Sequence, residues 1–342
     1  LTERKNFENI PRAIFLIGDS AKNIRSGQAM ETDKGGRITS AIFGNGPTDV
    51  DSLGKMVKKL YGKGEEGFNV SSCQFATHYF FKDMDTLQGF MRNVAECTKL
   101  NGYFIGTCYD GNTIFNLLKN KEIDENINIY NGKNKIWEIV KKYEHTEYPA
   151  NAQSLGYEID VYQDSINKTF PEWLVNYDYL LRIMENYGFQ PLTRKEAQDI
   201  GLPNSTGLFS ELFSLMENEI EKNPTLKNKY GNSQKMEPYE KKISFLNRYF
   251  VFKKVMHVNT QKIVLETEED IIIDKEVEAE LSSDEEEYKN EKEQEKEKEQ
   301  EIDKLVDETK EKKSKKSTKK STKKSPKKSV KKLSKKIILQ EE

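Results

Sequence analysis

The sequence contains little of the chemistry that metal centres and covalent catalysis require. It has three cysteines and three histidines among 342 residues. The cysteines, Cys73, Cys97 and Cys108, are odd in number and too irregularly spaced for a zinc site, which favours reduced thiols in an intracellular protein. No apolar run reaches about 18 residues, and we expect neither a transmembrane helix nor a signal peptide. The sequence therefore predicts a soluble chain that uses no metal and binds no membrane.

Apolar residues are also scarce. They make up 35% of the chain and charged residues 33%, so part of the chain lacks a hydrophobic core. The net charge of −2 conceals a segregation, because residues 266–303 are rich in Glu and Asp, whereas residues 312–336 repeat Lys and Ser without any acid. We therefore predict a folded domain over residues 1–265, followed by a disordered acidic and then Lys/Ser-rich tail over residues 266–342.

Two interpretations of the basic run Lys312–Lys336 stay open. It is either a generic solvated tail, or an electrostatic RNA tether or localisation signal. As a tether, its lysines would add affinity without sequence preference. Upstream of it, Glu291–Lys304 alternates Glu and Lys densely enough for a transient helix held by i,i+4 ion pairs.

Residues 68–107 carry the pattern of a strand, a helix and a second strand. Phe68–Cys73 is short, apolar and β-branched, and it ends in small polar residues. A helix is expected next, because apolar residues recur on one face at i, i+3, i+4 and i+7: Leu87, Phe90, Met91 and Val94. Asn101-Gly102 is expected to end this helix, before a strand over Gly102–Thr107.

These residues resemble the messenger RNA cap guanine-N7 methyltransferases, most closely those of large DNA virus capping enzymes. The family pattern SCQFxxHYxFE is matched by SCQFATHYFF, and its MLRN and GGYFIGT blocks by FMRNVAECTKLNGYFIGT. The resemblance extends over most of residues 10–255, through IPRAIFLIGDSAKNI, GYEIDVYQDSINKTFPEWLVNY and NRYFVFKK. Four blocks in the same order are far more specific than SCQF alone.

The resemblance implies an α/β fold, the class I S-adenosylmethionine-dependent methyltransferase with a Rossmann-like seven-stranded sheet of order 3-2-1-4-5-7-6. Ala13–Gly18 would be its third strand. The glycine-rich DLGCGxGGD turn that such a sheet uses for the methyl donor is missing from the sequence. We expect an N-terminally truncated domain without its first strands, in which Phe68–Cys73 exposes an apolar edge and Ala13–Gly18 lacks its neighbour.

The implied activity is transfer of the S-adenosylmethionine methyl group to N7 of the guanine that caps mRNA. N7 carries a lone pair and no proton, so the reaction needs positioning and no general base. We accordingly expect no catalytic residue in the strict sense and no metal. The alternatives are a catalytically silent cap- or RNA-binding fragment of a capping enzyme and a methyltransferase for another small guanine compound.

Four residues are assigned to the cap guanine by the resemblance. His78 would contact the guanine or its ribose, and Tyr79 would stack on the base or close over it. Glu172 would accept hydrogen bonds from the guanine N1 and N2 hydrogens, which adenine lacks. Tyr249 would face the cap from the last strand. The structural alternatives are a satisfied histidine at a helix start, a first-turn helix glutamate after Pro171 and aromatic core residues.

Four further residues are assigned to the methyl donor. Asp19 and Ser20 follow the predicted third strand, where the family carries an acid near the adenine amino group; a strand-end turn or helix cap is the alternative. Gln74 would face the donor from the end of the Phe68–Cys73 strand. Ala76 is small enough there for main-chain contact with the donor.

Partners and location follow from the same resemblance. The partner would be 5′-capped RNA, with upstream guanylyltransferase and triphosphatase domains or a missing N-terminal segment as further possibilities. We expect the protein to act in the cytoplasm, in a viral factory, or in the nucleus, and a location in the virion stays open. Strands are further predicted at Tyr157–Val161 and Phe245–Phe252. An amphipathic core helix is predicted from the stripe Phe209, Phe213, Met216 and Ile220.

Overall fold

The computed structural model describes residues 13–47, 49–266 and 292. The chain divides into two units, Leu1–Thr267 and Glu268–Glu342, and the fold below is that of the first. The predictions of a disordered tail, a transient helix at Glu291–Lys304 and a basic tether at Lys312–Lys336 fall outside the described residues, apart from positions 266 and 292.

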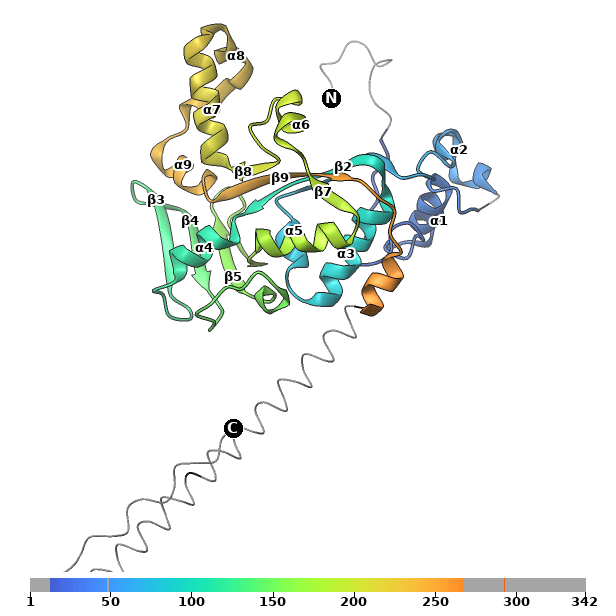
Figure 1. Cartoon of the computed structure of the whole chain (residues 1–342), viewed down its shortest axis with the longest axis horizontal. Helices are drawn as coiled ribbons and strands as arrows, with labels where there is room; N and C mark the ends of the chain where they lie inside the picture. Colours follow the sequence, from blue (N-terminus) through green and yellow to red (C-terminus); the bar gives the residue numbers. More distant parts are fainter. Residues whose placement is uncertain (1–12, 48, 267–291, 293–342) are drawn as a thin grey trace, which may run out of the picture. The chain divides into compact units, whose positions relative to one another are not determined.

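A mixed sheet of five strands forms the centre of the first unit (Figure 1). The strands follow the order β1-β2-β9-β7, and β8 also pairs with β9. β1 and β2 are parallel, whereas β9 is antiparallel to β2, β7 and β8. The strands are β1 (Phe68–Gln74), β2 (Thr98–Tyr109), β7 (Phe189–Pro191), β8 (Thr206–Leu208) and β9 (Asn247–Lys254). The path corresponds to the 4-5-7-6 half of the expected sheet, which confirms the predicted fold class.

Helices cover both faces of this sheet. On one face, α3 (Met84–Cys97) and α5 (Tyr177–Asn186) lie side by side in Figure 1, and their apolar residues form one core with Phe250 and Phe252 of β9. On the other face, α6 (Arg194–Asp199) packs on Val251. Successive strand residues point to opposite faces, so alternate residues of β9 pack into the two cores.

A second, antiparallel sheet carries one wall of the candidate site. Its strand order is β3-β4-β5-β6, and α4 (Gly111–Leu118) packs against it over a core that includes Trp137 and Ile139. The indole N–H of Trp137 donates a 3.0 Å hydrogen bond to the hydroxyl of Tyr109, at the end of β2, and so ties the two sheets together. The strands are β3 (Asn126–Asn131), β4 (Asn134–Lys141), β5 (Glu158–Gln163) and β6 (Lys168–Trp173).

The remaining helices are short, except one. The stripe at Phe209–Ile220 lies in the helix α7 (Phe209–Lys222) as predicted, with Phe213 and Met216 buried. The others are α1 (Asp33–Ile42), α2 (Lys55–Leu60), α8 (Lys227–Tyr230) and α9 (Pro238–Ser244), with 3₁₀ segments η2 (Val50–Leu53), η3 (Thr77–Phe80), η4 (Ala152–Ser154), η5 (Pro224–Leu226) and η6 (Gly231–Lys235). Among the described residues, no helix combines the length and the apolar character that crossing a membrane requires.

Two local predictions are wrong. Ala13–Gly18 forms no strand: one isolated bridge joins Gly18 to Met30, and Phe15 is 92% exposed. Apolar residues alone do not make a strand, because the strand also needs a neighbour to pair with. The helix expected to end at Asn101-Gly102 ends at Cys97 instead, and Asn101 lies inside β2 with a φ of 62°.

The predicted exposed edge is present. In the described part of the chain β1 pairs with β2 alone, and its Phe68 and Val70 side chains are 42% and 47% exposed. An edge of this kind offers unpaired backbone groups beside apolar side chains.

Candidate methyltransferase cleft

A cleft of about 550 Å³ lies where β1 and β2 end. Open α/β sheets bind their ligands at the carboxyl ends of the parallel strands, so this is the expected place for a site. The antiparallel sheet forms the facing wall through β5 and β6. The lining residues are Phe75, His78, Tyr79, Tyr109, Val161, Gln163, Ile166, Lys168, Phe170, Glu172, Ile243 and Asn247.

His78 and Glu172 face each other at the buried end of the cleft. They come from η3 and β6, and their residues are 5% and 7% exposed. His78 Nδ1 lies 3.5 Å from Glu172 Oε2, and within the described residues neither that oxygen nor either imidazole nitrogen has a hydrogen-bond partner. Buried polar atoms without partners are uncommon and costly. The pair thus presents buried polar atoms that a hydrogen-bonding ligand can satisfy.

Burial sets the charge state of this pair. Desolvation lowers the pKa of His78 from 6.5 to about 4, so the imidazole is neutral at physiological pH. Desolvation also raises the pKa of Glu172 from 4.5 to about 7. The carboxyl group therefore exchanges its proton near neutrality. Both structural alternatives differ from what is seen, because within the described residues the His78 ring nitrogens have no hydrogen-bond partner, and Glu172 lies in a strand and not in the first turn of a helix.

Aromatic side chains form the outer part of the η3 wall. Tyr79 is 44% exposed, and its ring meets that of His78 edge-on at a centroid distance of 4.2 Å. Phe75, 53% exposed, has a φ of 52°, a left-handed conformation that is unusual for a bulky residue. That conformation turns the chain sharply between β1 and η3.

Tyr249 lies apart from these residues. It is 6% exposed, its hydroxyl donates to the Asn204 carbonyl at 3.1 Å, and it is absent from the cleft lining. The β9 residue that does line the cleft is Asn247, which pairs with Tyr109 in the register of the two strands.

Two of the predicted donor residues lie at the end of β1. The Gln74 side chain accepts a hydrogen bond from the Thr107 hydroxyl at 2.9 Å and donates one to the Ser72 hydroxyl at 3.0 Å. Ala76 follows, half-buried against the core under η3. Both lie within four residues of His78 along the chain, so a donor bound here would adjoin the cleft.

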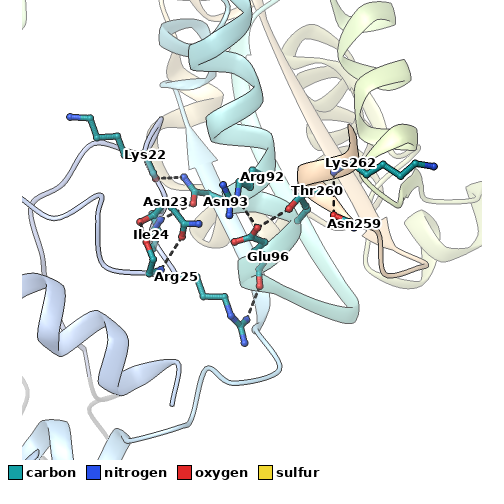
Figure 2. A network of polar contacts seen from close by, with 12 residues as sticks. Lys22, Asn23, Ile24, Arg25, Arg92, Asn93, Glu96, Asn259, Thr260 and Lys262 are labelled. Carbon is teal, nitrogen blue, oxygen red and sulfur yellow. Dashed lines mark hydrogen bonds and ion pairs between the residues drawn. The ribbon is translucent and has the colours of Figure 1, made fainter. Parts of the chain in front are cut away.

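The other two donor residues, Asp19 and Ser20, belong to a segment fixed on α3. Figure 2 shows this segment approaching Asn93, which is 3% exposed. Asn93 donates to the carbonyls of Ser20 and Lys22, both at 2.7 Å, and accepts from the Ile24 amide at 2.8 Å.

Gly89, one helical turn before Asn93, permits this contact. A Cβ atom there would lie 1.9 Å from the Ala21 carbonyl oxygen. Arg25 completes the attachment by donating to the Glu96 carbonyl at 3.0 Å (Figure 2). The segment keeps its place on α3 although the preceding described residues, Ala13–Gly18, form no strand.

The Asp19 side chain itself is exposed. Its carboxylate accepts from the Ala21 amide at 2.9 Å and lies 3.5 Å from the Lys22 ammonium group. A solvent-facing carboxylate in a fixed turn is able to accept a hydrogen bond from an amino group, so its chemistry fits a purine amine. In the part of the chain that is described, no cluster of His, Cys, Asp and Glu has the composition of a metal site.

Sequence reasoning missed several lining residues, above all Tyr109, Lys168, Phe170 and Asn247. The last three could have been found from the sequence. Lys168, Phe170 and Glu172 alternate along one strand, although a helix start after Pro171 was the structural alternative considered for Glu172. Asn247 opens the strand in which Tyr249 was chosen.

The sequence model that describes the mRNA (guanine-N(7))-methyltransferase domain matches residues 37–255. The chain belongs to this family. The matched range includes the whole cleft and both sheets, and it begins after the Asp19–Arg25 segment.

Relatives of the methyltransferase domain are found in a virus and in eukaryotes. The chain is 28% identical to a probable mRNA-capping enzyme of Acanthamoeba polyphaga mimivirus, over 75% of the chain and 22% of the relative. It is 30% identical to an mRNA cap guanine-N(7) methyltransferase of Drosophila melanogaster, over 44% of the chain and 33% of the relative. The chain thus spans about a fifth of the first of these relatives and a third of the second.

A solved structure of an S-adenosylmethionine-dependent methyltransferase from Clostridium acetobutylicum aligns with 55% of the chain and 58% of its own length. The sequence identity is 12% and the TM-score 0.29, too low to support an argument.

Proposed function

We propose that this domain transfers a methyl group from S-adenosylmethionine to N7 of the guanine that caps mRNA, with capped RNA as its partner. Membership of the mRNA (guanine-N(7))-methyltransferase family supports the reaction class. The buried pair of His78 and Glu172 carries the proposal, because it offers a carboxylate oxygen that has no hydrogen-bond partner among the described residues, at the end of a cleft large enough for a nucleotide.

Glu172 is proposed to select guanine. Its anionic carboxylate accepts hydrogen bonds from the N1 and N2 hydrogens, and adenine has no donor at either position. Selection of this kind is strong, because a wrong base leaves a buried charge unpaired. His78 contacts the guanine or its ribose with a neutral imidazole, and the exposed Tyr79 ring closes on the base plane.

We also propose that Tyr249 contacts the cap, and its hydrogen bond gives it a second role. Its hydroxyl is engaged by Asn204, so it also fixes the loop before β8. Asn247 is the β9 side chain that borders the cleft.

The methyl donor is proposed to lie on the β1 side of the cleft. Gln74 and the main chain at Ala76 would border it, while Asp19 and Ser20 would approach its adenine. When bound, S-adenosylmethionine supplies an electrophilic methyl group. The guanine N7 lone pair needs no base to attack, so the residues of the chain act by orienting the base and excluding water.

The proposed reaction is tested by following labelled methyl transfer from S-adenosylmethionine to GpppA-capped RNA, with ApppA-capped RNA as the control. Transfer to the first alone, recovered as N7-methylguanine, is the expected result. Equal transfer to both RNAs contradicts guanine selection by Glu172.

A cap-binding domain without activity is the second candidate. The unpartnered pair of His78 and Glu172 in the cleft supports this candidate too, because base binding there requires no methyl donor. Cap binding without binding of S-adenosylhomocysteine, and without transfer, is the outcome that distinguishes it from the enzyme.

A further inference from the structure

We propose that Lys168 forms a phosphate subsite at the mouth of the cleft, where it binds the phosphates of a guanine nucleotide whose base lies against Glu172. The inference rests on the proposed function and adds to it a residue that contacts the triphosphate of the cap. The argument comes from the geometry of β6.

Three cleft residues share one face of β6. Lys168, Phe170 and Glu172 are two residues apart, so their side chains leave the strand in the same direction. The neighbouring strand repeats the arrangement, since Gln163 pairs with Lys168 and Val161 with Phe170, and both partners line the cleft.

The exposure of this row changes steadily along the strand. Glu172 is 7% exposed, Phe170 is 37% exposed, and Lys168 lies in solvent. β6 therefore leads from a buried carboxylate, past an aromatic ring, to a cation at the surface. The order is that of the chemical groups of a nucleotide: a base with hydrogen-bond donors, a sugar and an anionic phosphate chain.

The spacing suits a nucleotide as well. Strand residues rise by about 3.3 Å, so the four steps from Glu172 to Lys168 cover about 13 Å. A guanine fixed at Glu172 extends its ribose past Phe170, and its phosphates then come within reach of the flexible Lys168 side chain.

The charge balance of the cleft supports this role. Within the described residues that line it, Lys168 is the one side chain with a permanent positive charge, and no carboxylate in the described part forms an ion pair with it. Glu172 alone would repel an anionic ligand, because its charge lies in the same cleft. A cation at the mouth offsets that repulsion and orients the nucleotide with its phosphates outward.

The test is equilibrium binding of guanosine, GTP and GpppA to the full chain and to the Lys168→Gln and Lys168→Arg variants. Lys133→Gln is the matched control, because it removes the same charge from an exposed position of the same sheet, between β3 and β4. We expect Lys168→Gln to weaken the binding of GTP and GpppA by roughly tenfold and the binding of guanosine by less than about twofold. Lys168→Arg should retain most of the affinity, and Lys133→Gln should match the unmodified chain.

Salt dependence gives an independent measure. The slope of log Kd against log salt concentration for GTP should fall by about 1 in Lys168→Gln, because one phosphate contact is lost. Equal weakening of guanosine and GTP overturns the subsite, since it indicates a structural effect, and so does unchanged GTP affinity. If the unmodified chain binds guanosine and GTP equally well, the base site stands and the phosphate subsite falls. If it binds neither, the proposed function itself fails.

Discussion

The Nδ1 atom of His78 lies 3.5 Å from the Oε2 atom of Glu172, and within the described residues both atoms are buried without a hydrogen-bond partner. The distance is too long for a hydrogen bond between them. With the pKa of His78 lowered to about 4 and that of Glu172 raised to about 7, the two side chains do not form a full ion pair at neutral pH. We propose that the pair is a recognition element whose polar groups are completed by the ligand.

Guanine binding should depend on pH through Glu172. The carboxyl group must lose its proton to accept from guanine N1 and N2, and burial raises its pKa to about 7. The affinity for GpppA should rise about tenfold per pH unit between pH 5 and 6.5 and level off above pH 7.5. Calorimetric titration at constant ionic strength measures this. A flat profile in the unmodified chain, or a pH dependence that persists in Glu172→Gln, would remove Glu172 from recognition.

The same carboxyl group should lower the stability of the free domain at alkaline pH. Its pKa is 4.5 when unfolded and about 7 when folded, so the folded chain holds the proton more tightly, and stability falls as pH rises from 4.5 to 7. Glu172→Gln should therefore raise the free energy of unfolding by about 1–3 kcal/mol at pH 8. The gain should shrink towards pH 5.

The effect of His78 on folding stability has the opposite sign and falls in a neighbouring pH range. Its pKa falls from 6.5 to about 4 on folding, so stability is lost as pH falls from 6.5 to 4. Urea unfolding at pH 5, 6.5 and 8 separates the two effects, with Glu144→Gln at an exposed position as the control for Glu172→Gln. An equal gain in the free energy of unfolding of Glu172→Gln at all three pH values would contradict the raised pKa of Glu172.

Asn93 should decide whether the Asp19–Arg25 segment stays on α3. Replacing it with Ala removes three hydrogen bonds and leaves the Ser20 and Lys22 carbonyls and the Ile24 amide without their partner. We expect a cost of about 1–3 kcal/mol in local stability. Hydrogen exchange should accelerate by about tenfold or more in residues 19–25 and remain unchanged in β4 and β5.

Lys22→Ala is the control for this experiment, because it shortens an exposed side chain of the same segment without touching the Asn93 contacts. If Asn93→Ala leaves exchange in residues 19–25 unaltered, the segment is held by something else. If the donor site includes Asp19 and Ser20, binding of S-adenosylhomocysteine should weaken in Asn93→Ala while GpppA binding does not.

The open edge of β1 should drive self-association. Phe68 and Val70 are exposed beside a strand whose second edge has no partner in the described part of the chain. Val70→Lys should suppress concentration-dependent association, because a lysine at a sheet edge opposes further strand pairing. Light scattering between low and high protein concentration measures the effect. Lys99→Ala, a change at a half-buried position of β2, serves as the control, and association that is equal in all three proteins would exclude β1 as its cause.

The parallel half of the fold was predictable because its signals are local. The Phe68–Cys73 strand and the helix with Leu87 and Val94 each carry a periodic apolar pattern, and the structure has both. The end of that helix was not predictable from Asn101-Gly102. The left-handed turn at Asn101 indeed exists, but it lies within a long twelve-residue strand.

The site was predictable only in part. His78 and Glu172 were found by resemblance and do lie together, whereas periodicity placed neither of them. Ala13–Gly18 shows the limit most clearly, because its apolar pattern is that of a buried strand, but within the described residues its pairing is limited to the isolated bridge from Gly18 to Met30. The β3 and β4 hairpin was missed although its signals are in the sequence, because polar and apolar residues alternate from Asn126 to Ile129 and Asn131-Gly132 is a typical hairpin turn.

Guanine recognition by Glu172 is tested most directly by comparing two affinities in one variant. The Kd values of GpppA and S-adenosylhomocysteine are measured for the unmodified chain and for Glu172→Ala, with ApppA as the control ligand. The account predicts that the unmodified chain prefers GpppA to ApppA and that Glu172→Ala weakens GpppA by roughly 10- to 100-fold, the loss of a charged hydrogen-bond acceptor. The Kd of S-adenosylhomocysteine should change by less than about twofold. Equal loss of both ligands, or equal binding of GpppA and ApppA by the unmodified chain, would contradict it.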